Sequence, residues 1–196
     1  NGTDYSSLSS ITVTAGQLTG TASFTPTDDS VYENDETAII SIDSVSGADA
    51  TESGTQSVTI TVTEDESTPV VTLATSNTSI AEDAGSSLTL TATLSVATTE
   101  DVTVALGTAG TGTEGTDYGV ISDITVLAGQ LTGTASFTLT NDSTYEGDET
   151  AVVSITSVSG GSANESGTPQ EVTITISENE SAPVVTLATS ASTIAE

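Results

Sequence analysis

Alternating apolar and polar side chains run through most of the chain between residues 69 and 180. The alternation is clearest in seven stretches, at 70–75, 87–95, 101–106, 123–129, 131–139, 150–159 and 171–177. A period of two places every second side chain on the same face of a strand, and the valine, isoleucine and threonine in these stretches favour strands. Gly-, Asp- and Asn-rich segments separate them. The pattern therefore predicts seven short strands and no helix.

Seven strands within residues 69–180 are typical of an all-β domain. We expect an antiparallel β-sandwich of the immunoglobulin-like kind with Greek-key connections. The sequence "AGQLTG" at 128–133 predicts a tight hairpin connection between two strands. Val, Ile and Leu side chains, together with Phe137 and Tyr145, are expected to fill a mostly aliphatic core.

The chain repeats itself at the length of a whole domain. "GTDY" occurs at 2–5 and 115–118, and "AGQLTGTASFT" occurs at 15–25 and 128–138, both with an offset of 113 residues. "PVVTLATS" occurs at 69–76 and 183–190, with an offset of 114. We therefore expect tandem sandwiches. Residues 1–66 would be the C-terminal part of a preceding repeat, 69–180 one complete repeat, and 183–196 the start of the next.

The charge has one sign only, which restricts the possible chemistry. The chain has 28 Asp and Glu residues, no Lys, Arg or His, no Cys, and a net charge of −28. Nucleic acid is an unsuitable partner because both surfaces would be negative. The usual nitrogen and sulfur ligands of zinc and copper are missing. Oxygen ligands remain, and these suit calcium and magnesium. No apolar run is long enough to span a bilayer.

The acids gather in loops at the ends of the predicted strands. They lie in "IAEDAG" (80–85), "EGTDYG" (114–119), "NDSTYEGDE" (141–149) and "SENE" (177–180). A sandwich has loops only at its two poles, and counting strand reversals allows these segments to share one of them. Carboxylates brought together there repel one another unless a hard cation lies among them. The pattern predicts a calcium site at one pole.

These motifs, taken in order with "LTGTASFTLTNDSTYEGDETAVVSI" and "VTITISENE", resemble the Calx-beta family. The resemblance covers 69–180, and 1–66 and 183–196 as partial copies. The family includes calcium-binding regulatory domains of sodium–calcium exchangers and tandem repeats of large bacterial surface proteins. The resemblance implies calcium ligands at Glu82, Asp117, Asn141, Asp142, Glu146, Glu178 and Glu180. In the first repeat it implies Asp4, Asp28, Asp29, Glu33, Glu64, Asp65 and Glu66, and Glu196 would open the site of a third repeat.

Two departures and several simpler interpretations stay open. Asn141 and Asn179 stand where the family often has an acid, which lowers the ligand charge. Acidic loops are also common as solvated surface. Asp148 and Glu149 are interpreted mainly as supporting or capping residues. Tyr118 and Tyr145 are interpreted as packing residues at the pole, and Asp4 and Asp117 are also typical turn formers.

The leading functional hypothesis is structural. We expect an internal segment of an extracellular, bacterial cell-surface protein, in which calcium stiffens the joints between repeats of an adhesin stalk or filament. Its partners would be neighbouring repeats of the same chain, or identical chains in a filament. The alternatives are a calcium-sensing domain pair of the exchanger type and a ligand-binding adhesive module. No catalytic constellation is visible, so we do not expect an enzyme.

Overall fold

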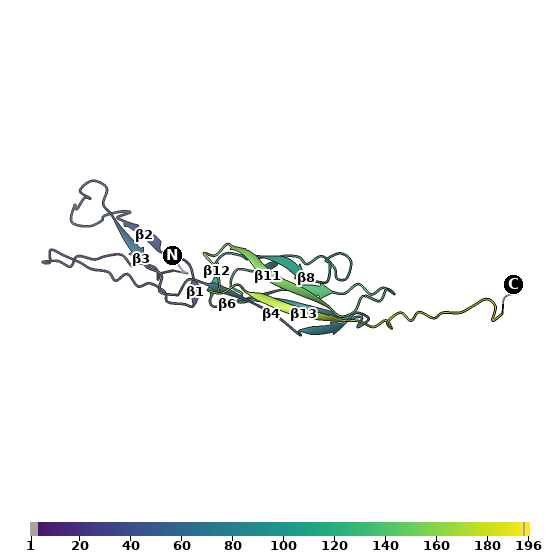
Figure 1. The fold of residues 1–196 in the computed structure, drawn as a ribbon. Coiled ribbons are helices and arrows are strands. Elements are labelled where there is room, and N and C mark those ends of the chain that lie inside the picture. The colour runs from purple at the N-terminus through teal and green to yellow at the C-terminus, as the bar shows by residue number, and fades with distance from the viewer. Residues whose placement is uncertain (1–3, 194) are drawn as a thin grey trace.

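The computed structural model describes residues 4–193 and 195–196, and residues 69–180 of it form a two-sheet β-sandwich (Figure 1). One sheet has four strands in the order β10-β6-β4-β12. These are β10 (Thr132–Thr138), β6 (Ser87–Leu94), β4 (Val70–Thr75) and β12 (Asn164–Glu165). The other sheet has five strands in the order β5-β13-β11-β8-β9. These are β5 (Ser79–Ala81), β13 (Glu171–Ser177), β11 (Glu149–Ser159), β8 (Val102–Gly110) and β9 (Ile124–Val126).

The prediction of an all-β, immunoglobulin-like sandwich is confirmed. All seven predicted strands are present, and the long pairs β6–β10, β4–β6, β8–β11 and β11–β13 are antiparallel. Three short strands, β5, β12 and β7 (Ala97–Thr98), were not predicted; β5 and β12 each pair in parallel with a strand of one of the two sheets. They have only three, two and two residues, too few for a period of two to stand out from the background. The described residues contain no helix.

The predicted hairpin at 128–133 is wrong in one respect. The turn is tight, since Gln130 donates its amide to the Leu127 carbonyl at 2.9 Å. However, β9 and β10, which the turn connects, belong to different sheets. The "AGQLTG" segment therefore carries the chain from one layer of the sandwich to the other.

The core lies between the two sheets and is mainly aliphatic. Leu90, Val104 and Ile174 are fully buried, with Phe137 among them. The prediction that Tyr145 fills the core is wrong, because its side chain is 45% exposed. Its place is taken by Tyr118, which is buried and stacks on Phe137 with ring centroids 5.0 Å apart. Tyr145 lies in the long loop before β11, beyond the end of the sheets, where no second layer can cover it.

The first repeat contains only part of a sandwich. Its strands are β1 (Val31–Tyr32), β2 (Glu36–Ser41) and β3 (Ser57–Val62). β2 and β3 pair in the same register as β11 and β13, with Glu36 opposite Val62 as Glu149 is opposite Ile176. Counterparts of β4 to β8 do not lie ahead of these strands in this chain. As a result, Ile11 and Val13 are exposed here, whereas their counterparts Ile124 and Val126 are fully buried in the complete repeat.

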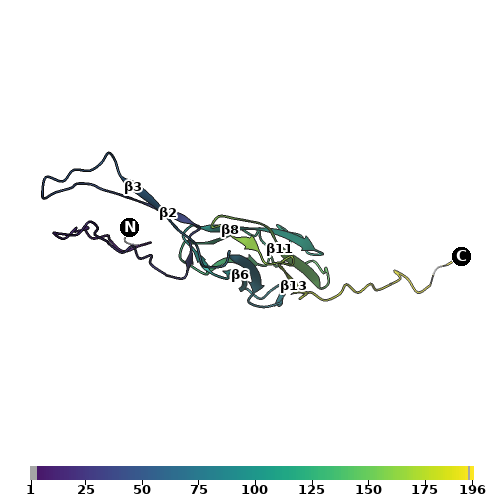
Figure 2. The same cartoon turned by 90° about the vertical axis from the view of Figure 1, so that its left-hand side faces the viewer.

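The two repeats follow one another along a single long axis (Figures 1 and 2). β1 pairs in parallel with β7 (Ala97–Thr98), a strand at the near end of the complete repeat. The described residues from 181 onward form no strand and extend away from the opposite end. In the described part of the chain, no helix has the length and hydrophobicity that crossing a membrane requires.

Candidate metal centre

Four acidic segments meet at the end of the complete repeat that faces the C-terminal tail, here called the acidic pole. Its carboxylates come from Glu82, directly after β5, from Asp117 in the loop after β8, from the loop 141–149 before β11, and from Glu178 and Glu180 after β13. β5 and β13 run in parallel, with Ile80 opposite Ile176, so both strands deliver their acids to the same end. The topology therefore gathers segments up to about a hundred residues apart in sequence.

The first group of carboxylates consists of Glu82, Glu178 and Glu180. Each offers an oxygen, and these oxygens lie within 4.8 Å of one another. Glu82 is only 9% exposed, and its Oε1 accepts a hydrogen bond from the Asp142 amide at 3.0 Å. The Oε2 atom of Glu180 is buried and has no hydrogen-bond partner among the described residues. A buried carboxylate oxygen without a protein donor is stabilised by a water molecule, a proton or a cation.

Glu178 has a different environment, in which backbone amides surround its carboxylate. Its Oε2 accepts from the amides of Glu146 at 2.6 Å and Gly147 at 2.8 Å. Its Oε1 accepts from the amides of Asn179 and Glu180, both at 2.8 Å. The amide hydrogen bonds from Glu180, Glu146 and Gly147 lower the pKa of Glu178 to about 2. Glu178 therefore stays ionised and ties the loop before β11 to the segment that leaves β13.

The pKa of Glu180 is shifted in the opposite direction to that of Glu178. The hydrogen bond that it shares with Glu178 raises the pKa of Glu180, and burial and the charge of Glu178 raise it further. Two carboxylates in contact favour one shared proton over two negative charges. A divalent cation at the same place would remove the need for that proton.

The second group consists of Asp117, Glu146 and Glu149, whose oxygens also lie within 4.8 Å of one another. Burial raises the pKa of Glu146, and the charges of Asp117 and Asp142 add to the effect. Burial and the charge of Asp117 likewise raise the pKa of Glu149. The group lacks any positive partner, as the composition requires.

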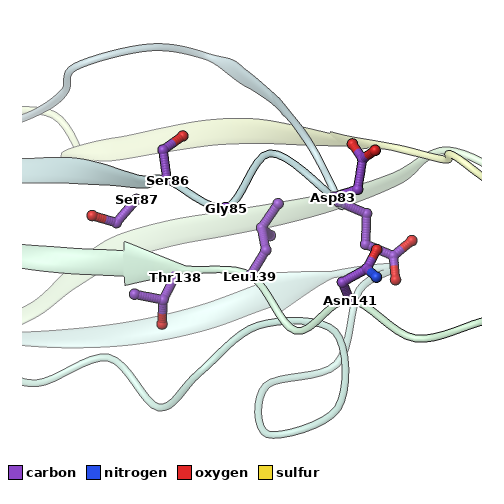
Figure 3. A pocket seen from close by; sticks show the side chains of 8 residues that line it. Asp83, Gly85, Ser86, Ser87, Thr138, Leu139 and Asn141 are labelled. Atoms are coloured by element: carbon purple, nitrogen blue, oxygen red, sulfur yellow. The ribbon is translucent and has the colours of Figure 1, made fainter.

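A shallow depression beside the first group is lined by Glu82, Asp83, Gly85, Ser86, Ser87, Thr138, Leu139 and Asn141. Asn141 and Asp83 lie at one end of it, Ser86 and Ser87 at the other, and Leu139 between them (Figure 3). Its lining is about equally polar and apolar. Asn141 lines this depression together with Glu82 of the first group.

The first repeat reproduces this arrangement. Asp4, Glu33 and Glu36 form one group and correspond in sequence to Asp117, Glu146 and Glu149. The other group is Asp28, Asp65 and Glu66. Asp28 and Asp65 correspond to Asn141 and Asn179, so this group has acids at both positions where the complete repeat has amides. It has no counterpart of Glu82 in this chain.

Glu64 reproduces the role of Glu178. Its Oε2 accepts from the amides of Glu33 and Asn34, and its Oε1 from those of Asp65 and Glu66. Burial opposes ionisation of Glu64, but the amides of Glu33 and Glu66 outweigh it and lower its pKa to about 2. The side-chain hydrogen bond with Glu64 raises the pKa of Glu66 to about 7. The same local electrostatics therefore occur twice.

Some predicted ligands lie beside the groups, and two members of the groups were missed. Asp142 and Asp29 use a side-chain oxygen to accept an amide hydrogen bond two residues further on, from Thr144 and Val31. Glu196 is exposed in the C-terminal tail. Glu149 and Glu36 belong to the groups although Glu149 was interpreted as a supporting residue and Glu36 was not considered. The signal for both was the repeated "DET", whose Glu opens a strand at the pole. The ligand role of all these residues stays a prediction.

The comparison with known protein families gives one result. The family model described as "Calx-beta domain" matches residues 1–66 and 64–180. This chain belongs to the Calx-beta family. The prediction of tandem Calx-beta repeats is therefore confirmed at family level, while the limits of the repeats and the start of a third at 183 stay predictions.

Two further comparisons complete the picture. A solved structure described as "Crystal structure of Apo-form Calx CBD1 domain" is similar, with 16% sequence identity and a TM-score of 0.46. The match covers 58% of this chain and 99% of that one. No curated protein matches this Calx-beta chain.

The chemistry of both groups fits a hard cation. Every donor is a carboxylate oxygen, three converge in each group, and Glu180 Oε2 is buried without a donor. Calcium takes six to eight oxygen ligands at about 2.3–2.6 Å and tolerates flexible loops.

Proposed function

We propose that this chain is a segment of a calcium-binding array of Calx-beta repeats. Calcium at each acidic pole stiffens the joint to the next repeat, and the array forms an extracellular stalk or surface filament. Its contacts are with neighbouring repeats, and it carries out no catalytic reaction.

One observation carries the proposal. Two groups of three carboxylates lie side by side at the acidic pole, one of them contains a buried oxygen without a hydrogen-bond donor, and the chain has no cationic side chain to neutralise either. The first repeat also has two groups of three carboxylates, and one of them corresponds residue by residue to Asp117, Glu146 and Glu149. Solvated surface acids would have no reason to converge or to be buried, because repulsion and desolvation both disfavour it.

The chain's own residues explain how a cation there would act on the joint. Glu82, Glu178 and Glu180 would hold one cation, and Asp117, Glu146 and Glu149 another. Glu178 and Glu180 belong to the segment that leaves β13 and leads to the next repeat, whereas the other four belong to the body of the sandwich. A bound cation supplies positive charge between these two parts, so the exit segment would be held at a fixed angle.

The extracellular stalk is supported by composition and repetition. Near-identical repeats in one chain suit an extended spacer better than a receptor surface. Calcium near millimolar concentration outside cells suffices even for weak sites. The absence of Lys and Arg leaves no site for trypsin-like proteases.

Calcium-dependent unfolding tests the proposal. We expect the melting temperature, followed by circular dichroism, to rise with millimolar calcium and to rise much less with magnesium, which demands a smaller and more regular octahedral site. Identical melting curves in calcium and in chelator would contradict the proposal.

A matched pair of variants locates the site. Glu180→Gln removes the charge of the carboxylate with the orphan oxygen, so calcium affinity should fall about tenfold or more. Without calcium, the same variant should melt at an unchanged or higher temperature, because it relieves repulsion with Glu178. Glu171→Gln removes one charge from the exposed start of β13, the end of the strand that lies away from Glu180. This control should change neither the calcium affinity nor the melting temperature. Equal effects of the two variants would mean that only total charge matters.

Calcium affinity separates the stalk from a calcium sensor of the exchanger type. Half-saturation of this chain near extracellular calcium levels, about millimolar, supports a structural site that is filled throughout the life of the protein. Half-saturation near micromolar calcium, together with a change in shape, would favour the sensor instead.

A further inference from the structure

The loop before β11 of the complete repeat and its counterpart before β2 of the first repeat have different environments. In the first repeat this segment is Val31–Asn34, and Val31, Tyr32 and Glu33 are half-buried. The corresponding residues of the complete repeat, Thr144–Glu146, are all exposed, with Tyr145 at 45%. The two segments, VYEN and TYEG, share the central Tyr and Glu, and the main difference in environment lies in what covers each loop.

The first loop is covered by the repeat that follows it. Val31 and Tyr32 form the strand β1, which pairs in parallel with Ala97 and Thr98 of β7. Thr98 is fully buried. This pairing joins an acidic pole to the opposite pole of the next repeat, where β7 and the turn after β11 lie.

Asn34 adds a second contact. Its Oδ1 accepts hydrogen bonds from Ser162 Oγ and from Tyr32 Oη, both at 3.1 Å. Asn34 and Ser162 both have a positive φ, 68° and 54°, an uncommon conformation for residues other than glycine. A hydrogen bond between repeats thus connects two residues that hold left-handed backbone conformations.

The complete repeat has the same backbone but lacks this side chain. Gly147 corresponds to Asn34 and has a φ of 80°. Tyr145 corresponds to Tyr32. The loop is therefore shaped to present the same strand edge and the same aromatic ring, without the amide oxygen.

We propose that the loop Thr144–Gly147 is a docking surface for the following repeat of the array, which pairs its counterpart of β7 with Thr144 and Tyr145. The occupant is a Calx-beta repeat of the same array, since the first loop already carries one in this position. The joint after Asn34 has a side-chain bond between repeats and the joint after Gly147 has none, so the two joints differ in stiffness. The contact uses backbone and neutral side chains and does not require a cation.

Disulfide trapping tests the docking directly, because the chain contains no cysteine. Paired residues on parallel strands lie about 4.8 Å apart, within the range that a disulfide spans. In the existing chain we expect the pair Val31→Cys with Ala97→Cys to oxidise at least about tenfold faster than a control pair, Val31→Cys with Ser143→Cys. Ser143 is exposed at the far pole of the complete repeat.

The second loop is tested in a chain that carries a further repeat. A copy of residues 83–180 appended after Glu196 completes the repeat that begins at 183. Thr144→Cys should then oxidise rapidly with a cysteine at the appended counterpart of Ala97, and slowly with one at the appended counterpart of Ser143. Equal rates for these two pairs would overturn the proposal.

A variant of the existing chain tests the role of the Asn34 side chain. This test does not depend on folding of the longer protein. Asn34→Gly should slow oxidation of the Val31 and Ala97 cysteine pair severalfold while leaving the melting temperature of the complete repeat unchanged. An unchanged oxidation rate would overturn the assigned difference between the joints. The oxidation rates of the existing and the extended chains are measured with and without calcium. If calcium does not change these rates, the calcium-stiffening function is contradicted and the docking is not.

Discussion

In a chain without cationic side chains, backbone amides stabilise particular ionised carboxylates. Glu64 and Glu178 each accept four backbone amide hydrogen bonds, which replace the missing cationic partner. Hydrogen bonds to an ionised carboxylate are stronger than neutral ones. The neighbouring Glu66 and Glu180 have no such support, and their pKa values are raised.

These opposite shifts predict how stability depends on pH without calcium. The pKa of Glu66 is about 7 in the folded protein and 4.5 in a free side chain, so its contribution is present below pH 4.5 and is lost as pH rises to about 7. Glu180, Glu146 and Glu149 have raised pKa values and act in the same direction. Glu178 and Glu64, with pKa values of about 2, stabilise the fold above pH 4.5 and lose that effect as pH falls toward 2.

Calcium-free protein should therefore melt at the highest temperature near pH 4.5, and at progressively lower temperatures up to pH 7. With saturating calcium the decline above pH 4.5 should disappear, because the cation replaces the protons. Circular dichroism melts in dilute solution, across this pH range with and without calcium, measure both. A calcium-free melting temperature that rises from pH 4.5 to 7 would show that the raised pKa values do not govern stability.

At the same scale, the sequence predicted which acids converge at the pole better than which tyrosine fills the core, and calcium binding stays a prediction. Repetition and one-signed charge indicated an oxygen-ligand site, and five of the six residues in the two groups of the complete repeat were named. Glu149 was missed because its role depends on where β11 begins. Tyr118 was interpreted as a packing residue and is buried against Phe137, whereas Tyr145 was predicted in the core and is exposed, because only the three-dimensional course of the loops decides which ring faces Phe137.

Secondary-structure elements explain why certain glycines are needed where the chain passes between layers. A Cβ atom at Gly133, in β10, would lie 2.3 Å from the Thr125 carbonyl oxygen of β9. The same close approach occurs in the first repeat, where a Cβ at Gly20 would lie 2.5 Å from the Thr12 carbonyl oxygen. The repeated "LTG" therefore allows two backbones to touch at the point where the chain changes sheets.

Gly133→Ala should lower the free energy of unfolding by about 1–3 kcal/mol, because the added methyl forces the two backbones apart. Gly167→Ala is the control, since a Cβ there has nothing within 4 Å and the residue does not have a positive φ. That change should be neutral or slightly stabilising, by up to about 1 kcal/mol. Urea unfolding of both variants in calcium measures the difference, and equal stabilities would contradict the close approach of β9 and β10.

The strands themselves were predictable because each long strand has one buried face. Leu88, Leu90 and Ala92 alternate with exposed or half-buried threonines in β6, for example. The sheet to which each strand belongs was not predictable at the "AGQLTG" turn. A tight turn has the same local sequence whether the next strand pairs with the previous one or crosses to the other layer.

The whole molecule combines a complete sandwich with an incomplete one. Residues 69–180 bury a continuous core between two sheets, whereas residues 8–25 of the first repeat form no strand and expose apolar side chains. Their counterparts in the complete repeat, residues 121–138, include β9 and β10, which pair with β8 and β6 respectively. The first repeat in this chain has no copy of those two partners.

Hydrogen exchange should reveal this difference directly. Amides of β8, β11 and β13 should exchange slowly, because they lie in the centre of a sheet and open only with global unfolding. Amides of 8–25 should exchange within seconds, since few of them have a hydrogen-bond partner in the described structure. One that does is Gln17, which donates to Thr14 at 2.9 Å.

A copy of residues 69–113 placed before residue 1 supplies the missing strands. Exchange in 8–25 should then slow at least about tenfold, while exchange in β11 stays unchanged. Mass spectrometry after pepsin digestion suits a chain without trypsin sites. If 8–25 were already as protected as β11 in the existing chain, the first repeat would have to close its core by another route, and the division into one complete and one partial sandwich would be wrong.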